Sequence, residues 1–333
     1  MRKTVSFTRR SANVFFHILT RCNLRCRHCY INPDQHGHAT LDRDIIVRWL
    51  AIFAQRHASP NVIFLGGEPT LHPDLAHAVK RAREIGYASV TIDTNGYLFH
   101  HILDRVTPDE VDYFSFSLDG PAAQVNDPLR GEGSYEQCIR GITEAKKRGF
   151  AISLIYTVSR ANIDHLQHMP ALLAKLGVNR FFIQVIGVRG QWAQDAQRRD
   201  ALAQVNRDTW LAVIPRVAES AARLGITTIF PKVFLDPAEA FECAGQVADN
   251  YFIFPNGRVY RCPLCEDYPM HSLEIRDNRL IETAKINEAD LFALSIPEGC
   301  VMNRIIQPCN LLSPAEGQRP YRIACCMLKE EIA

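Results

Sequence analysis

The chain has 333 residues, of which 47% are hydrophobic and 22% charged, as is usual for a soluble globular protein. Its 38 lysines and arginines nearly balance its 36 aspartates and glutamates, so charge gives no support to a nucleic-acid or membrane-surface role. No apolar run is long enough to span a bilayer, and no apolar signal-peptide core follows the basic first residues. We therefore expect a cytoplasmic protein with no nucleic-acid and no membrane partner.

Six short apolar segments alternate with amphipathic helical stretches between about residues 13 and 190. These segments are Val14–Leu19, Val62–Leu65, Ser89–Asp93, Tyr113–Leu118, Ala151–Val158 and Arg180–Ile186. They are apolar on both faces and rich in β-branched or aromatic residues, which is typical of buried parallel strands. The alternation predicts an α/β fold with right-handed crossovers, either an open doubly wound sheet or a barrel.

The rest of the chain has a different character. A long helix is predicted over Ala201–Leu224, and the strand–helix alternation then stops. Tyr251–Phe254 and Arg258–Arg261 flank a Pro-Asn-Gly turn, which predicts a hairpin in which Gly257 takes a positive φ. We expect two domains, residues 1–228 and residues 229–333.

Cysteine usage is the unusual feature of the composition. There are eleven cysteines, an odd number, in a chain without an export signal. That favours metal binding or catalysis over a disulfide framework. Three lie near the start and seven in the C-terminal part, which predicts two separate metal regions. Cys138, on a predicted apolar helix face, is interpreted as core.

The first group consists of Cys22, Cys26 and Cys29, which follow the first predicted strand with the spacing C-x3-C-x2-C. Thiolates are the ligands of iron–sulfur clusters, and three of them leave one iron of a [4Fe–4S] cluster open. The alternative is a zinc site, with His28, His36 or His38 as a fourth ligand.

This segment resembles the cluster loop of the radical S-adenosylmethionine (radical SAM) enzymes, in which C-x3-C-x-aromatic-C follows the first strand of a partial TIM-like barrel. His28 occupies the aromatic position. Further motifs agree in order, three of them at the end of a predicted strand: Gly66-Gly67-Glu68-Pro69 resembles the family's GGEP, Asp93-Thr94-Asn95-Gly96 its TNG, Ser115–Gly120 its S-x-S-x-D-G, and Asp127–Gly131 its basic loop. The resemblance implies a partial (β/α)6 TIM-like barrel with its site at the carboxyl ends of the strands.

The resemblance also implies site residues. Cys22, Cys26 and Cys29 would bind a [4Fe–4S] cluster whose open iron chelates SAM. The implied SAM contacts are Gly66 and Gly67 at the methionine amino group, Glu68 at the same ammonium, Ser117 and Asp119 at the ribose, Arg130 at the carboxylate, His28 and Tyr30 near adenine, and Asn95 at the cofactor or its turn.

The second group begins with Cys243, Gly257 and Cys262, whose C-x13-G-x4-C spacing is similar to the opening of the SPASM and twitch extensions. Those extensions bind one or two auxiliary [4Fe–4S] clusters. The later cysteines depart from the full SPASM spacing. The predicted ligands are Cys243, Cys262, Cys300 and Cys309, with Cys265, Cys325 and Cys326 in reserve. Zinc is again the alternative.

The function implied by the resemblance is reductive cleavage of SAM to a 5′-deoxyadenosyl radical, which abstracts hydrogen from a substrate. Many relatives with such extensions modify peptides, so a peptide or protein is the first expectation. The alternatives are a small molecule (a tetrapyrrole, cofactor precursor or sugar) and a metal-binding protein without catalysis. A reductant such as ferredoxin or flavodoxin is implied as a partner.

Overall fold

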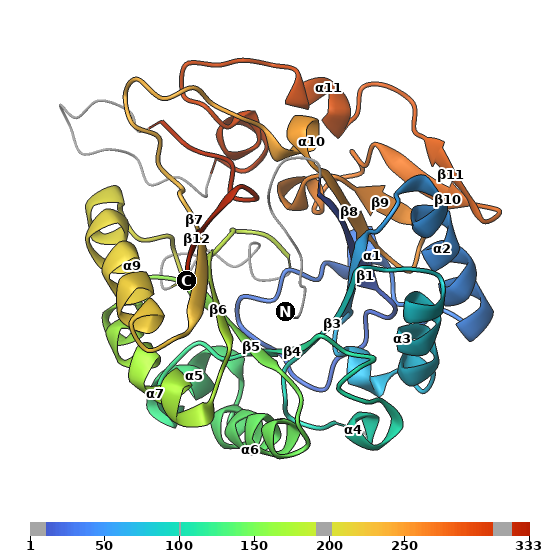
Figure 1. Cartoon of the computed structure of the whole chain (residues 1–333). Coiled ribbons are helices and arrows are strands. Elements are labelled where there is room, and N and C mark those ends of the chain that lie inside the picture. Colours follow the sequence, from blue (N-terminus) through green and yellow to red (C-terminus); the bar gives the residue numbers. More distant parts are fainter. Residues whose placement is uncertain (1–10, 100, 191–201, 309–321) are drawn as a thin grey trace.

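The computed structural model describes residues 11–99, 101–190, 202–308 and 322–333. A curved wall of parallel strands surrounds the centre of the molecule, and helices cover its outside (Figure 1). Neighbouring strands of this wall follow the order β8-β1-β2-β3-β4-β5-β6-β7. Their bounds are β1 Ala12–His17, β2 Asn61–Leu65, β3 Ser89–Thr94, β4 Tyr113–Ser117, β5 Ile152–Val158, β6 Arg180–Val185, β7 Thr227–Pro231 and β8 Asp249–Ile253.

The six strands expected from the sequence are all present, and their ends differ by no more than two residues. The α/β barrel-like fold is therefore confirmed, and β7 and β8 lengthen its wall. The predicted hairpin is confirmed as β8 and β9 (Arg258–Tyr260), with Gly257 at φ +88°. A Cβ there would lie 2.7 Å from the carbonyl oxygen of Ile275, so the turn also needs glycine for space.

Helices connect the strands on the outer face. They are α1 Pro33–His36, α2 Arg43–Arg56, α3 Leu75–Glu84, α4 Ile102–Arg105, α5 Ala123–Arg130, α6 Ser134–Lys147, α7 Met169–Leu176 and α9 Arg207–Ala222, followed by α10 Ala244–Val247 and α11 Glu288–Phe292. In α2, the fully buried Ile46, Leu50 and Phe53 recur every three or four residues, which turns one apolar face towards the sheet.

The start of one of these helices, α9, differs from the prediction. The helix predicted from residue 201 begins at Arg207, because the side chain of Asn206 accepts a hydrogen bond from Thr209 N at 2.8 Å and caps it. Residue 201 itself lies outside the described residues.

The C-terminal part extends the sheet at both of its edges. Beyond β8 lie the antiparallel strands β9, β10 (Leu273–Arg276) and β11 (Arg279–Glu282). At the other edge, β12 (Lys329–Ile332) runs antiparallel to β7. The domain boundary predicted at residue 228 falls inside β7, and one sheet runs through both predicted domains.

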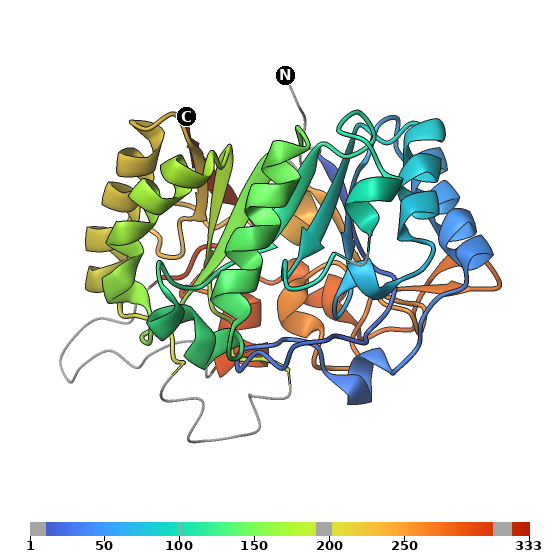
Figure 2. The same cartoon turned by 90° about the horizontal axis from the view of Figure 1, so that it is seen from below.

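The amino-terminal end of the wall is closed by a polar network. Asn13 Nδ2 donates to Asn250 Oδ1 at 2.9 Å, and Asn61 Nδ2 donates to Asn13 Oδ1 at 3.1 Å. Ser89 Oγ continues the chain to Asn61 Oδ1 at 2.8 Å. These residues satisfy one another and fill the floor of the barrel. Space for a ligand is left at the opposite end, where the loop of residues 18–32 crosses the bottom of the view in Figure 2.

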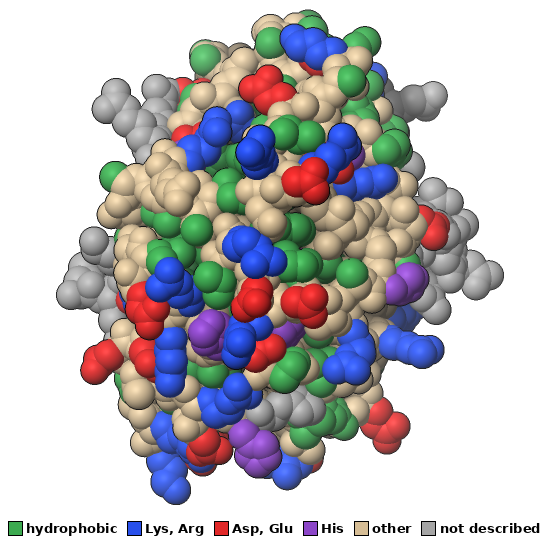
Figure 3. Space-filling view, turned by 90° about the vertical axis from the view of Figure 1, so that its right-hand side faces the viewer, with side chains coloured by type: hydrophobic (Ala, Val, Ile, Leu, Met, Phe, Trp, Pro, Cys, Tyr) green, Lys and Arg blue, Asp and Glu red, His purple; other side chains and the backbone are tan. Residues whose placement is uncertain are grey.

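The outer surface carries mixed charge. On the face shown in Figure 3, lysine and arginine side chains are interspersed with aspartate and glutamate. Within the described ranges, no helix combines the length and the apolar character needed to cross a membrane.

Candidate functional site

A cavity of about 290 Å³ lies at the carboxyl ends of the parallel strands. The three cysteines of the first group line it, as do all the residues predicted to contact SAM except Asp119. The C-terminal part contributes further lining residues, namely Phe252, Pro263, Glu266, Cys326, Met327 and Lys329. The structure therefore brings both cysteine regions to one cavity.

The cysteine loop is held against the end of β2 by the two glycines of the second motif. Gly67 N donates to Leu19 O at 3.1 Å, and Glu68 N donates to Arg21 O at 2.9 Å. A Cβ on Gly67 would lie 2.3 Å from Arg21 O, and one on Gly66 would lie 2.7 Å from Leu19 O. Both contacts involve backbone, which has little freedom to move aside. Only glycine fits this close approach.

Glu68 links the second motif to the third. Its Oε1 accepts hydrogen bonds from Thr70 N, from Thr70 Oγ1 at 2.7 Å and from Thr94 Oγ1 at 2.8 Å. Its Oε2 accepts from Asn95 N at 2.8 Å. Burial raises the pKa of Glu68, and these hydrogen bonds oppose the shift. The expectation was a contact with a ligand ammonium; in the structure the carboxylate is fully buried and binds the two motifs together.

Asn95, from the third motif, reaches the cysteine loop. Its Nδ2 donates to Asn23 Oδ1 at 2.9 Å and lies 3.7 Å from Cys22 Sγ. The side chain therefore orders the loop and faces the cavity at the same time.

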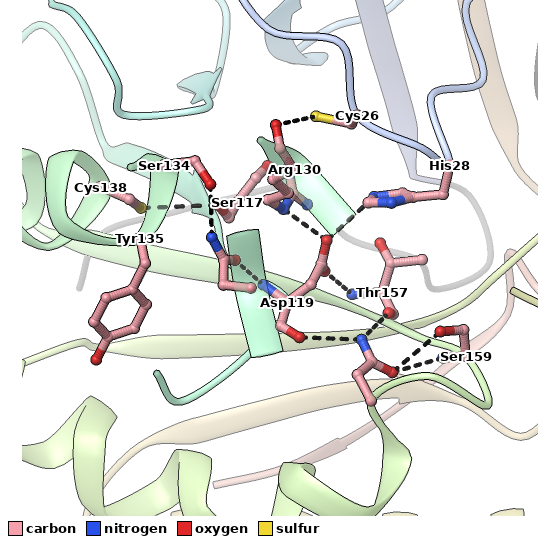
Figure 4. A network of polar contacts seen from close by, with 12 residues as sticks. Cys26, His28, Ser117, Asp119, Arg130, Ser134, Tyr135, Cys138, Thr157 and Ser159 are labelled. Carbon is pink, nitrogen blue, oxygen red and sulfur yellow. Dashed lines mark hydrogen bonds and ion pairs between the residues drawn. The ribbon is translucent and has the colours of Figure 1, made fainter. Parts of the chain in front are cut away.

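Asp119 is the centre of a buried polar network (Figure 4). Its Oδ2 lies 2.6 Å from Arg130 Nε and 3.2 Å from His28 Nε2, and its Oδ1 accepts from Thr157 N at 2.8 Å. Burial lowers the pKa of His28 to about 4, with Arg130 adding to the effect. His28 is thus neutral at pH 7 and contacts Asp119 as a hydrogen-bond donor. In this position Asp119 holds the cysteine loop to the end of β4, and it does not line the cavity where a ribose would bind.

Arg130 takes part in this network through both its side chain and its backbone carbonyl. Its guanidinium pairs with Asp119, and its carbonyl oxygen lies 3.8 Å from Cys26 Sγ. The residue also lines the cavity.

A second buried network joins the cysteine loop to the C-terminal part. His17 Nδ1 lies 2.9 Å from Ile253 O, and its Nε2 lies 2.7 Å from Tyr30 Oη. Because a carbonyl oxygen only accepts, Nδ1 carries the proton and Nε2 accepts from the Tyr30 hydroxyl. Arg189 lies over the Tyr30 ring, 4.7 Å from its centroid, and donates to Glu266. No motif in the sequence pointed to His17, Arg189 or Glu266.

The C-terminal part of the described chain holds a cluster of six neighbouring cysteines: Cys243, Cys262, Cys265, Cys300, Cys325 and Cys326. Electrostatic interactions couple Cys262 and Cys325 to each of Cys243, Cys300 and Cys326. Burial is the main factor that raises the pKa of the Cys243 and Cys300 thiols, each to about 12. Cys309, one of the predicted ligands, lies outside the described residues.

The donor chemistry of both cysteine groups suits an iron–sulfur cluster. A [4Fe–4S] cluster takes a thiolate at each iron. The first group presents three thiols from one loop, and the second presents thiols from several separate segments. A single ion would need three or more donors already close together. Within the described ranges, no group of three or more His, Cys, Asp or Glu side chains is already close enough together to hold a single metal ion.

The chain has recognisable relatives. The family model of the radical SAM superfamily matches residues 16–173. Pre-heme d1 synthase of Dinoroseobacter shibae is 32% identical over 64% of this chain and 52% of its own length. PqqA peptide cyclase of Ruegeria pomeroyi is 29% identical over 76% of this chain and 68% of its own. The chain spans about half the length of several curated relatives that it matches.

Among solved structures, Streptococcus suis SuiB has a similar fold. It superimposes with a TM-score of 0.62 at 14% identity, covering 85% of this chain and 65% of SuiB. The cysteine loop and the glycine, TNG and S-x-S-x-D-G motifs all lie at the carboxyl ends of adjacent strands, in the region matched by the family model. Residues 16–173 of the chain therefore belong to the radical SAM superfamily.

Proposed function

We propose that this protein reductively cleaves SAM and uses the resulting radical to abstract hydrogen from a substrate bound in the barrel. The observation that carries the proposal is the single cavity lined by Cys22, Cys26 and Cys29, by the Gly66-Gly67 edge and by residues of the C-terminal part. When bound, the reduced [4Fe–4S] cluster supplies the electron that splits SAM into methionine and a 5′-deoxyadenosyl radical.

The protein's own residues would bind and orient the reactants. Cys22, Cys26 and Cys29 would hold the cluster. The groups assigned to SAM are the backbone of Gly66 and Gly67 and the cavity-lining side chains of His28, Tyr30, Asn95, Ser117 and Arg130. Glu68 and Asp119 act through these groups as positioning residues, because their carboxylates are fully buried and bonded within the protein.

We assign an auxiliary [4Fe–4S] cluster to the C-terminal cysteines. Cys243, Cys262, Cys300 and Cys325 are its best-supported ligands, since Cys262 and Cys325 each interact electrostatically with both Cys243 and Cys300 and the four come from separate segments. Cys265 and Cys326 are close alternatives. Cys265 Sγ contacts Met302 Sδ at 3.5 Å, and Cys326 lines the main cavity. The free state of all ten described cysteines agrees with a reducing, cytoplasmic location.

A peptide or protein is the proposed substrate. The similarity to PqqA peptide cyclase supports this, because it extends over 76% of the chain and reaches the C-terminal part. A tetrapyrrole is the second candidate, supported by the higher identity to pre-heme d1 synthase over a shorter stretch.

The electron donor is proposed to be a small acidic protein such as ferredoxin or flavodoxin. Arg21, Arg25 and Arg27 are exposed on the cysteine loop and give it a positive surface. Positive charge beside the cluster site would steer an acidic partner to it.

The proposed function is tested by anaerobic reconstitution with iron and sulfide, followed by reduction with dithionite in the presence of SAM. We expect about eight irons per chain, and methionine and 5′-deoxyadenosine in equal amounts. Samples without dithionite should form neither product. A fully loaded and reduced protein that leaves SAM intact would refute the proposal.

Gly67→Ala is expected to weaken SAM binding at least about tenfold, because the new Cβ would push Arg21 and the cysteine loop away from β2. The measurement is the SAM dissociation constant of the reconstituted protein. Gly86→Ala is the control, since Gly86 has φ +96° and no neighbour within 4 Å. It should lower stability through backbone strain and leave SAM affinity unchanged. Equal SAM affinities for the two variants would contradict the predicted role of Gly67.

A further inference from the structure

A buried carboxylate lies beside the second cysteine group. Glu288, the first residue of α11, is fully buried. Its Oε2 accepts a hydrogen bond from Cys262 N at 3.0 Å. Its Oε1 accepts from Arg261 N at 2.7 Å, from Ser272 N at 3.1 Å and from Ser272 Oγ at 2.9 Å. One side chain therefore joins the residues that follow β9 to the residue that precedes β10.

Glu288 takes over where the sheet ends. The pairing of β9 with β10 stops at Val259 and Leu273, two residues before Arg261. The N–H groups of Arg261 and Cys262 lie beyond this pairing, and both donate to the Glu288 carboxylate. Leaving such a buried N–H group without an acceptor would destabilise this conformation of the segment. The carboxylate thus sets where the backbone of Cys262 lies.

The backbone around Glu288 is itself fixed. Glu288 N donates to Met270 O at 2.8 Å. The preceding residue, Asn287, caps α11: its Oδ1 accepts from Ala289 N at 2.9 Å, and Asp290 Oδ2 accepts from Asn287 N at 3.0 Å. This reciprocal capping holds the first turn of the helix in place. Glu288 therefore projects from a rigid base.

The other end of α11 contacts a second cysteine-bearing segment. Phe292, the last residue of the helix, packs on Gly245 of α10, where a Cβ would lie 2.6 Å from the phenyl ring. Cys243 is the residue that precedes α10 and forms its N-cap. At its two ends, α11 thus contacts the segments that carry two of the assigned cluster ligands, Cys262 and Cys243.

We propose that Glu288 is a positioning residue for the auxiliary cluster and acts through Cys262. By holding the Cys262 backbone, it keeps the thiol beside those of Cys243, Cys300 and Cys325 before iron is bound. A ligand that is already in place loses less conformational freedom on binding, so the cluster is held more tightly. This inference rests on the proposed function, since it takes the second cysteine group to be a cluster site.

Glu288→Gln separates the two sides of this carboxylate. A glutamine has one acceptor oxygen and one donor nitrogen. The oxygen is best placed on the side of Arg261 and Ser272, where three donors meet, so the nitrogen faces Cys262 N and that hydrogen bond is lost. Ser272→Ala is the matched control, because it removes one hydrogen bond from the opposite oxygen and keeps the contact with Cys262.

The test uses the full chain with Cys22, Cys26 and Cys29 replaced by alanine, so that iron reports on the second group alone. After anaerobic reconstitution, the rate of iron loss to a chelator is measured, and the EPR spectrum of the dithionite-reduced cluster is recorded. Glu288→Gln should lose iron at least about tenfold faster than its parent and show a changed spectrum. Ser272→Ala should match the parent in both.

A second variant keeps the inference testable if Glu288→Gln does not fold. Asn287→Ala removes the cap of α11 and leaves the carboxylate intact, and it should speed iron loss at least about threefold. The inference is overturned if the parent binds no iron, if iron loss from Glu288→Gln equals that from the parent, or if Ser272→Ala has the same defect, which would indicate general loosening of the hairpin. Failure of the proposed function appears separately, as absence of SAM cleavage by the wild type.

Discussion

Replacing Cys22, Cys26 and Cys29 together with alanine is expected to remove about four irons per chain and to abolish 5′-deoxyadenosine formation. The three thiols line one cavity, and the one further described cysteine that lines it, Cys326, belongs to the second cysteine group, so a single thiol is left there when the three are removed. Iron and sulfide are counted after anaerobic reconstitution, and 5′-deoxyadenosine is measured by chromatography after reduction with SAM.

Cys138→Ala provides the matched control. Cys138 is 1% exposed on α6, and its thiol lies 3.7 Å from Ser117 O. This variant should keep its full iron content and lose only a modest amount of stability. If the triple variant retains all its iron, the cluster assignment fails. If it loses every iron, the C-terminal thiols do not hold a separate cluster.

Asp119→Ala is expected to reduce the free energy of unfolding by about 3–5 kcal/mol, because it leaves the Arg130 guanidinium buried without its partner. His28 loses its hydrogen-bond acceptor at the same time, so the loop that carries Cys26 and Cys29 is released from β4. We therefore also expect lower iron retention after reconstitution. Chemical denaturation of the metal-free protein measures the first effect, and iron counting measures the second.

The control for this change is Asp104→Ala. Asp104 also pairs with an arginine, Arg148, but its side chain is 54% exposed. Water screens such a pair, so its loss should change the free energy of unfolding far less than the loss of Asp119 does. A ribose-binding role for Asp119 predicts a different result, in which SAM affinity falls while stability and iron content are kept. That outcome, or equal destabilisation by the two variants, would refute the positioning role.

The position of the motif residues at the cavity could be predicted from the sequence. Gly66, Gly67 and Asn95 follow strand ends directly, so their position depends on a few neighbouring residues and on the shared edge of a parallel sheet. The sequence could not tell which way a polar side chain turns at such an edge. Glu68 and Asp119 were both expected to contact SAM. Both carboxylates are bonded to residues of other motifs, and of the two only Glu68 also lines the cavity.

Residues that reach the site through long-range pairing were missed. Lys329 lies in a strand of four residues with no apolar pattern, and only its register with β7 turns it inwards. Arg189 and Glu266 depend on contact between segments 77 residues apart. For a related reason β7 was missed, and β8 was expected only as a hairpin strand and not as part of the parallel wall. The alternation of strand and helix was taken to end near residue 190, whereas pairing with the existing edges continues the sheet.

The pairing of β8 with β1 affects how the chain folds while it is being synthesised. Asp249 pairs with Ala12, and Lys329 pairs with Pro231, so both outer edges of the parallel sheet remain open on the ribosome until these late segments have been synthesised. Contacts between such distant residues slow folding, and open strand edges invite pairing with other chains. The nascent barrel thus depends on protection during synthesis, and a fragment ending near residue 228 would expose the β1 edge permanently.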